Sequence, residues 1–522
     1  MEAHDAAVRR IAAQVKTFHE AQKPFRIYHG STNSTRTSHR RADNTIDTSR
    51  LNHVLSVDKT GMTALVEPNV PMDELVDATL AHGLVPPVVM EFPGITAGGG
   101  FSGTSGESSS FRYGAFDSTF DWIEIVLADG ATARASRTDK ADLFWGAASA
   151  FGTLGVVTLL AVRLRPAKRY VALRYELARG GAEAAVRRMR EQCDAPANDF
   201  VDGVAFDAGT TLLCTGRLAD ELPAGEAPRR FTRPSDPWFY IRAREVRRLL
   251  EEQEDKDAVV VDHVPLVDYL FRWDRGGFWV GEYAFAYFRV PFNRVTRRLL
   301  DGFMRARVMY RAVHGSGLAD AYMVQDVGVP FARAAEFRAW LDGALGIYPL
   351  WLCPLRVRRG DDGDAAAAHG LHAEFGAPDA PDLVNFGVWG PLRRCPRRAQ
   401  VVEANRALER KVAELGGKKW LYAHAYYTED EFWAHYDRPA YDALRAKYAA
   451  SHLPSVYDKV RVDVDAEEAA RRRSRRARAR GALGRVWPLR GLKGFWAAAR
   501  GGDYLLKRTS RRKPDTGETE SG

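Results

Sequence analysis

The stretch EFPGITAGGGFSGTSGESSSFRYG, from Glu91 to Gly114, decides the fold of this 522-residue chain. Glycine, serine and threonine dominate it, so we expect neither a core helix nor a core strand here. Glycine allows close backbone approach and positive φ, and small hydroxyl residues with exposed N–H groups can surround a phosphate with donors. The stretch therefore predicts a loop that contacts a cofactor, with an inert structural loop as the alternative.

A dinucleotide fingerprint is formally present, because Gly98 to Gly103 satisfies the pattern GxGxxG. The Rossmann form of this motif needs a helix directly after the glycines, with its N-terminus on the pyrophosphate. Here the residues Thr-Ser-Gly-Glu-Ser-Ser-Ser follow, and they show no helical apolar period. We therefore reject the Rossmann interpretation.

Predicted strands flank the stretch on both sides. FRIYHG (25–30) is typical of a short strand, and the polar turn STNSTR after it has phosphate-binding character without the GK[ST] of a P-loop. WIEIVLADGATARAS predicts two strands joined by a hairpin at Asp129-Gly130. A helix capped at Asp139, the glycine turn FGTLGVVT and a strand ending at Pro166 follow.

The whole chain is too long for one ordinary core, so two or three domains are expected. The four cysteines are far apart and form no CxxC, which argues against a disulfide scaffold and predicts no metal site. No apolar run reaches the roughly 18 residues of a spanning helix, and the N-terminus lacks a signal-peptide core. An intracellular protein without a transmembrane helix is expected.

Basic charge is concentrated in a tail. Residues 471–522 hold 16 Lys and Arg against 4 Asp and Glu, whereas the rest of the chain holds 60 against 63. Three interpretations fit the tail: a segment that lies on anionic lipid, a nucleic-acid arm, or a solvated disordered tail. The first is favoured because Trp487, Leu489, Leu492, Phe495 and Trp496 are interleaved with basic residues, and no nucleic-acid partner is expected.

The combination of GSTNSTR, the Gly/Ser stretch, the Asp-Gly hairpin and FGTLGVVT resembles the FAD-binding domain of the PCMH type, also called vanillyl-alcohol-oxidase-like. Within that family, AYMVQDVGVP, GIYPLWLCPL, LYAHAYYTEDEFWAHYD and LPSVYDKV are similar to the Δ24-sterol reductases, the Diminuto or seladin-like subfamily. The resemblance covers residues 22 to 460 or so.

This resemblance implies an α+β fold in four parts. A PCMH-type FAD-binding domain occupies 1–168, with subdomains at 22–90 and 91–168. An α+β substrate domain over 169–400 caps it, and the helical segment 401–470 returns to pack on the FAD-binding domain. The basic, partly disordered tail spans 471–522.

The resemblance also implies two FAD-binding loops. The first would bind pyrophosphate and the second the flavin, with two further residues near the ring or the ribityl chain. The implied contacts are Gly30, Ser31, Thr32, Asn33, Ser34 and Thr35, then Thr96, Ala97, Gly98, Gly99, Gly100, Phe101, Ser102, Gly103, Thr104, Ser105, Gly106, Glu107 and Ser108, and finally Gly155 and Val156.

Covalent attachment of FAD is not expected. Relatives that attach it use a histidine in the first loop, and some add a cysteine in the second. Those places hold Thr32 and the cysteine-free run 91–110, so the resemblance implies dissociable FAD. His29 lies close enough to the first loop to keep the covalent alternative open, although a histidine that ends a strand is more often structural.

The activity implied is reduction of the C24=C25 double bond of a sterol side chain, with NADPH as electron source and hydride delivered from flavin N5. An isolated alkene is no hydride acceptor, so the site needs an acid, a dry apolar slot and aromatic faces around the developing cation. No second nucleotide fingerprint marks an NADPH site. The alternatives are a flavin oxidase or dehydrogenase of an alcohol, sugar or lactone that uses oxygen, and a catalytically silent lipid-binding relative.

The aromatic run from Tyr269 to Phe288 supplies the candidate site residues. The substrate candidates are Tyr269, Trp273, Arg275, Phe278 and Trp279, although most aromatics in such runs are core. The catalytic candidates are Glu282, Asp274 and Tyr422, with a salt bridge to Arg272 or Arg275 as the alternative for Asp274. A peripheral position on the cytosolic face of a membrane, such as the endoplasmic reticulum, is expected, and the oligomeric state is open.

Overall fold

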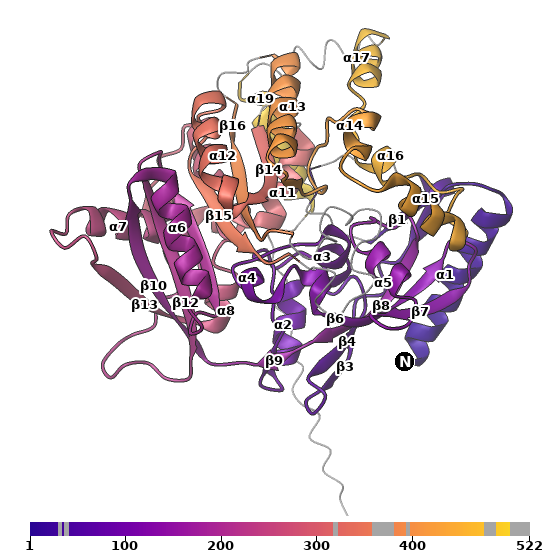
Figure 1. Ribbon diagram of the computed structural model, residues 1–522, viewed down its shortest axis with the longest axis horizontal. Helices are drawn as coiled ribbons and strands as arrows, with labels where there is room; N and C mark the ends of the chain where they lie inside the picture. The colour runs from indigo at the N-terminus through magenta and orange to yellow at the C-terminus, as the bar shows by residue number, and fades with distance from the viewer. Residues whose placement is uncertain are drawn as a thin grey trace, which may run out of the picture.

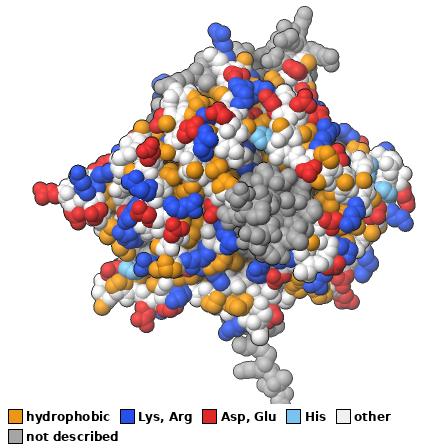
Figure 2. All heavy atoms as spheres, in the orientation of Figure 1, with side chains coloured by type: hydrophobic (Ala, Val, Ile, Leu, Met, Phe, Trp, Pro, Cys, Tyr) orange, Lys and Arg blue, Asp and Glu red, His pale blue; other side chains and the backbone are white. Residues whose placement is uncertain are grey.

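The computed structural model describes residues 1–29, 34–35, 41–316, 322–357, 380–392, 397–473 and 487–501 (Figure 1). Gly30, Ser31, Thr32 and Asn33 of the first predicted loop lie outside the described residues, as do residues 474–486 and 502–522 of the tail. On the face shown in Figure 2, acidic and basic side chains are interspersed, as the near balance of charge outside the tail predicts.

The N-terminal part is built on a five-stranded antiparallel sheet of order β3-β4-β8-β6-β7. A two-stranded parallel pair lies outside it, formed by β1 (Arg26–Tyr28) and β2 (Thr45–Asp47). The strands of the sheet are β3 (Val54–Asp58), β4 (Thr63–Val66), β6 (Phe120–Leu127), β7 (Thr132–Ser136) and β8 (Gly155–Arg163). The helices of this part are α1 (Glu2–Glu20), α2 (Met72–Leu80) and α5 (Ala141–Ala147).

The predicted hairpin is confirmed, and the predicted cap is wrong. Strands β6 and β7 pair across the Asp129-Gly130 turn, where Gly130 has φ +91°. The helix placed after Asp139 begins at Ala141, and its N-cap is Lys140 in the left-handed conformation with φ 50°. No side chain caps α5, so the capping rule for Asp pointed one residue too early.

The Gly/Ser stretch contains a helix, which corrects the sequence-based expectation. Helix α3 (Ala97–Gly103) has Thr96 as its N-cap, and the Thr96 hydroxyl accepts a hydrogen bond from Gly99 N at 3.2 Å. A Cβ on Gly98 would lie 2.7 Å from Pro68 Cβ, and one on Gly100 would lie 2.3 Å from Met90 Cε. Close packing therefore requires these glycines, and tertiary contact outweighs their low helix propensity. A second short helix, α4 (Ser110–Tyr113), follows.

The second part is built on an eight-stranded antiparallel sheet of order β13-β10-β12-β11-β15-β16-β14-β17. Its strands are β10 (Tyr170–Arg179), β11 (Phe200–Ala205), β12 (Thr210–Ala219), β13 (Val259–Pro265), β14 (Tyr322–Pro330), β15 (Leu350–Leu355), β16 (Leu383–Pro391) and β17 (Lys418–Lys419). Helices α6 (Gly181–Asp194), α12 (Phe331–Ala344) and α13 (Arg398–Glu414) cover one face (Figure 1).

Because side chains alternate along each strand, the other face of this sheet packs against the N-terminal part of the fold. In β15, Leu350 and Leu352 pack in the cluster under the covering helices, whereas Trp351 and Cys353 belong to the large core shared with the first part. Helices α7 (Phe239–Glu251), α8 (Leu266–Leu270), α9 (Val280–Phe288), α10 (Arg294–Leu299) and α11 (Ala306–Ser316) supply the remaining elements of the second part. The fold is α+β, as expected.

The predicted C-terminal segment 401–470 divides its contacts between the two parts. Helix α13 and strand β17 pack on β14 of the eight-stranded sheet. Helices α14 (Glu429–Trp433), α15 (Arg438–Lys447) and α16 (Val456–Val460) follow, and Tyr441 Oη donates to Thr153 Oγ1 at 2.8 Å. Helices α17 (Val464–Arg473) and α19 (Leu489–Gly501) end the described chain, and within it no helix is long and apolar enough to span a bilayer.

Candidate functional site

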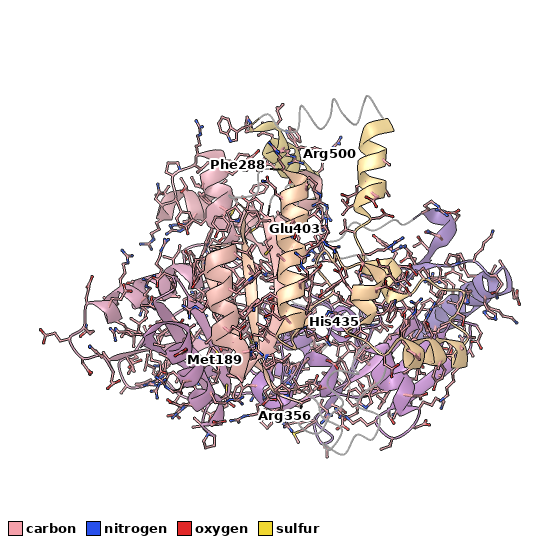
Figure 3. All side chains as sticks on the ribbon, turned by 45° about the horizontal axis from the view of Figure 1, so that its top comes forward. Met189, Phe288, Arg356, Glu403, His435 and Arg500 are labelled. Carbon is pink, nitrogen blue, oxygen red and sulfur yellow. The ribbon has the colours of Figure 1, made fainter. Side chains whose placement is uncertain are left out.

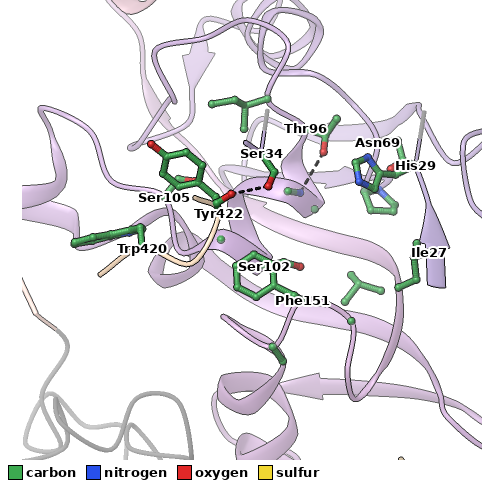
Figure 4. Close-up of a pocket in the computed structure, with 18 of the residues that line it drawn as sticks. Ile27, His29, Ser34, Asn69, Thr96, Ser102, Ser105, Phe151, Trp420 and Tyr422 are labelled. Carbon is green, nitrogen blue, oxygen red and sulfur yellow. Dashed lines mark hydrogen bonds between the residues drawn. The ribbon is translucent and has the colours of Figure 1, made fainter. Parts of the chain in front are cut away.

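A cavity of about 350 Å³ lies between the two parts of the fold (Figure 4). This volume falls within the range typical of small-molecule pockets. The wall includes, in chain order, Arg26, Ile27, His29, Ser34, Asn69, Glu91, Phe92, members of the stretch 96–106, Phe151, Gly155, Val156, Tyr310, Asp326, Trp351, Cys353, Leu355, Asn385, Trp389, Trp420, Tyr422 and Lys459.

One end of the cavity is formed by the two predicted FAD loops. Of the predicted contacts, the wall contains Ser34, Thr96, Gly98, Gly99, Ser102, Gly103, Ser105, Gly106, Gly155 and Val156. Ser34 Oγ donates to the carbonyl of Tyr422 at 2.5 Å, which ties the first loop to the C-terminal segment (Figure 4). The structure therefore brings Ser34 of the first loop, part of the second loop and the glycine turn before β8 to one site.

Other residues of the same predicted stretch are not in the wall. Ala97, Gly100 and Phe101 are buried in the core, and Thr104 O accepts a hydrogen bond from Trp420 Nε1 at 2.8 Å. Thr35 is buried and is also absent from the wall. Glu107 and Ser108 lie against the second part of the fold, where Glu107 Oε1 is 3.8 Å from Arg272 Nη1 and Ser108 Oγ is 3.3 Å from Tyr269 Oη.

Two cations line the loop end of the cavity. Burial lowers the pKa of Arg26, and no carboxylate forms a salt bridge with it among the described residues. Lys459 Nζ donates to the carbonyl of Phe151 at 2.6 Å. A half-buried guanidinium without a carboxylate beside glycine-rich backbone is suited to an anionic group. Sequence reasoning missed Arg26, although it lies in the predicted strand 25–30.

Aromatic side chains form the other end of the cavity. Phe92, Tyr310 and Trp389 contact one another, with ring centroids 6.0 to 6.5 Å apart, and Trp351 lines the same end. Phe92 belongs to the Gly/Ser stretch, whereas the other three come from α11, β16 and β15. Sequence reasoning missed all four as lining residues.

Asp326 of β14 presents a hydrogen-bonded carboxylate at this aromatic end. Its Oδ1 accepts from Asn385 Nδ2 at 3.1 Å, and its Oδ2 accepts from Trp389 Nε1 at 3.2 Å and from Tyr422 Oη at 2.5 Å. Burial raises the pKa of Asp326, and these three donors oppose the rise because they stabilise the anion. The predicted catalytic candidate Tyr422 therefore lines the cavity, and its hydroxyl is bound to a carboxylate.

Glu91 is a second carboxyl group in the cavity wall. Burial raises its pKa to about 8, and the nearby carboxylates of Glu107 and Asp326 act in the same direction. Its side chain forms no hydrogen bond to another described residue. At neutral pH Glu91 is therefore mainly a protonated acid that faces the cavity, whereas three hydrogen-bond donors stabilise the anionic form of Asp326.

The predicted substrate residues form the layer behind the aromatic wall. Phe278 lies 5.2 Å, between ring centroids, from both Trp351 and Trp389, and Trp279 Nε1 donates to Trp389 O at 2.7 Å. Trp273 packs on Phe278 at 4.5 Å. Tyr269 and Arg275 are buried too, and none of these five predicted residues lines the cavity. Phe278 and Trp279 thus contact the lining tryptophans from outside the cavity wall.

The remaining acid candidates are also outside the cavity. Glu282 accepts from Arg244 Nη1 at 3.1 Å on a part-exposed face. Asp274 pairs with Arg305 Nη1 at 2.9 Å and accepts from Ala306 N at 3.1 Å. The salt bridge suggested for Asp274 therefore exists with a different arginine, because Arg272 and Arg275 are bound to other aspartates. Both acids are close to the aromatic run in the sequence, but neither lies in the cavity wall.

Known proteins match this chain in two ways: a family model matches one part of it, and whole proteins match most of its length. The family described as "FAD binding domain" matches residues 6–136. This match places an FAD-binding domain of the PCMH type in the N-terminal part of the chain. It is also 28% identical over 423 residues to the Delta(24)-sterol reductase of Homo sapiens, which covers 78% of this chain and 76% of that protein.

Two further relatives extend the match beyond vertebrates, to a plant and a nematode. The Delta(24)-sterol reductase of Pisum sativum is 28% identical over 454 residues, which covers 79% of this chain and 76% of that protein. A Delta(24)-sterol reductase homologue of Caenorhabditis elegans is 27% identical over 437 residues, with 80% and 78% covered. The resemblance drawn from the loops and the C-terminal motifs is confirmed, and the chain is an FAD-binding oxidoreductase.

The residues present fit FAD. The loop end offers close glycine backbone, serine hydroxyls and the cation Arg26 for a diphosphate, and the cavity continues along aromatic side chains that suit a flat ring system. His29 lines the loop end as well, so a histidine side chain is within the wall where FAD would bind.

Proposed function

We propose that this protein reduces an isolated carbon–carbon double bond in a sterol side chain, with FAD as cofactor and NADPH as electron source. One observation carries the proposal: a single cavity joins the glycine-rich FAD loops to an aromatic end that holds two carboxyl groups in different environments. The printed name of its relatives, Delta(24)-sterol reductase, supports a sterol as substrate and C24=C25 as the bond.

The loop end holds and orients the cofactor. Arg26 and the hydroxyl groups of Ser102 and Ser105 would bind the diphosphate, and Gly155 and Val156 would lie along the flavin or its ribityl chain. FAD, when bound and reduced, supplies hydride. The contribution of the chain to the chemistry is then to position the alkene, to exclude water and to provide the proton.

Glu91 is the acid that we assign to the proton. An unconjugated alkene accepts hydride only when one carbon is protonated, so a proton at C24 leaves positive charge at the tertiary C25, where hydride completes the saturated bond. Glu91 lines the cavity and is protonated at neutral pH, because burial raises its pKa to about 8. The proton that Glu91 loses is replaced from solvent, and NADPH restores the reducing equivalents.

Asp326 takes the complementary role of a fixed negative charge. Its three hydrogen-bond donors favour the anion, and Tyr310 and Trp389 present aromatic faces at the same end of the cavity. A carboxylate and aromatic faces both stabilise positive charge that develops in a dry site. Tyr422, a predicted catalytic residue, then acts on the reaction through Asp326.

A two-stage anaerobic experiment tests the function. NADPH should bleach the flavin of the purified full chain, and a sterol with a C24=C25 bond should restore the oxidised spectrum with formation of the saturated product. No bleaching by NADPH would overturn the reductase assignment. Oxygen uptake with peroxide release on a polar alcohol, sugar or lactone, together with no response to sterols, would instead establish the oxidase alternative.

A further inference from the structure

A patch of exposed apolar side chains joins two elements that are far apart in the sequence. Thirteen large hydrophobic side chains are exposed among the described residues, and seven belong to α10 and to α19 with its preceding turn. They are Val295, Leu299, Trp487, Leu489, Leu492, Phe495 and Trp496. Isolated exposed hydrophobics are ordinary, but a gathered patch marks an interaction surface.

Helix α19 is held on the protein by its small residues. Gly491, Gly494 and Ala498 are buried, whereas the larger Leu492 and Trp496 are exposed. A Cβ on Gly494 would lie 2.5 Å from Ala312 O of α11, and one on Gly491 would lie 2.3 Å from Tyr287. This is the reverse of an ordinary amphipathic surface helix, which buries its large apolar residues. The large side chains of α19 therefore face outward and need another apolar phase.

Direct contacts connect α19 to the segment that carries α10. Trp487 Nε1 donates to Tyr287 O at 2.7 Å, and the Arg289 guanidinium lies 4.5 Å from the centroid of the Trp487 ring. Phe495 packs against Phe303, just after α10, with ring centroids 4.8 Å apart. Phe288 and Arg500, at the top of Figure 3, mark this side of the molecule. The two elements therefore belong to one surface.

The charge of this surface has a single sign. The sequence contains four arginines and no acid in 289–300, and two arginines, one lysine and no acid in 487–501. Exposed members of this set include Arg289, Arg294, Arg298, Lys493 and Arg500. Aromatic and aliphatic side chains ringed by cations are the composition of segments that lie in the headgroup region of anionic bilayers.

We propose that α10 and α19 together form a docking face for an anionic lipid bilayer, with the residues of α10 contributing as directly as those of the basic tail. The apolar side chains enter the headgroup and acyl boundary, and the basic residues contact lipid phosphates. A second copy of the chain is disfavoured as the occupant, because two such faces would bring like charges together. The inference does not depend on the substrate or the reaction.

Vesicle co-sedimentation of the full chain tests the face. Binding should be strong on phosphatidylcholine vesicles that contain phosphatidylserine and weak on phosphatidylcholine alone, and should fall with added salt. Leu299→Glu and Leu492→Glu should each weaken binding about tenfold or more, since each removes a leucine that the bilayer would bury and adds a charge that anionic lipid repels. Arg298→Gln should weaken it about fivefold, the equivalent of ~1 kcal/mol.

The matched control is Leu249→Glu on α7, where the leucine is 41% exposed against 42% for Leu492. It should leave vesicle binding unchanged, and far-ultraviolet circular dichroism and flavin absorbance report whether each variant is folded. Binding that responds to Leu492→Glu but not to Leu299→Glu would overturn the two-element face. A concentration-dependent dimer in analytical ultracentrifugation that both substitutions dissociate, without vesicle binding, would also overturn it.

Discussion

Replacement of Glu91 by glutamine should remove the alkaline limb of the catalytic pH profile, where the rate falls as the acid loses its proton. With the pKa of Glu91 raised to about 8 by burial and by neighbouring carboxylates, about nine-tenths of the protein carries the proton at pH 7 and about one-tenth at pH 9. If this proton reaches the substrate, kcat/KM for the alkene falls about tenfold over those two pH units. Glu91→Gln should lower the rate about 10² to 10⁴-fold and flatten the profile.

The two half-reactions allow a clean assay of this prediction. Stopped-flow absorbance follows flavin reduction by NADPH and, separately, reoxidation of the reduced flavin by a C24=C25 sterol. Glu91→Gln should slow only the second step, because only that step consumes the proton. Glu282→Gln is the matched control, since Glu282 was also a candidate acid but is paired with Arg244 outside the cavity wall. Reoxidation of Glu91→Gln at the wild-type rate, with the same loss above pH 8, would refute the assignment.

Three further predictions concern the N-terminal part. His4 bridges Glu67 and Glu124, and these hydrogen bonds raise the pKa of His4 to about 9. Up to about 3 kcal/mol of folding stability is therefore present below pH 6.5 and lost as the pH rises through 9. Urea unfolding at a series of pH values should show this loss, and His4→Gln should abolish it. Arg26→Gln should weaken FAD binding about tenfold or more in a titration of apoprotein, with partial retention in Arg26→Lys. Acid precipitation should release FAD equally from wild type and His29→Ala; retention on wild type alone would mean covalent attachment.

Local signals in the sequence predicted much of the FAD half of the site. The Asp129-Gly130 hairpin and the strand at 25–30 depend on turn chemistry and short-range alternation, which the chain carries locally. Helix α3 could not be predicted this way, because its glycines are set by the close approach of Pro68 and Met90 from other segments. Propensity describes an isolated segment, whereas these contacts exist only in the folded chain.

The carboxyl groups of the cavity were harder to predict than the FAD-binding loops. Glu282 and Asp274 are neighbours of the aromatic run in sequence, but salt bridges to Arg244 and Arg305 bind them elsewhere. Glu91 and Asp326 meet only because the two parts of the fold close on one cavity. A usable signal did exist: Asp326 interrupts an apolar strand, and a carboxylate in such a strand requires donors to offset its burial.

Helix α11 links the chemistry proposed for the cavity to the proposed lipid-facing surface. Tyr310 lies in the cavity wall, and on the same helix Ala312 O and Gly315 are in close contact with α19. One helix therefore separates the aromatic end of the cavity from side chains that face outward into the proposed bilayer. A water-insoluble alkene that leaves the bilayer here would travel a short apolar path, and the dry site that protonated Glu91 requires would stay closed to water.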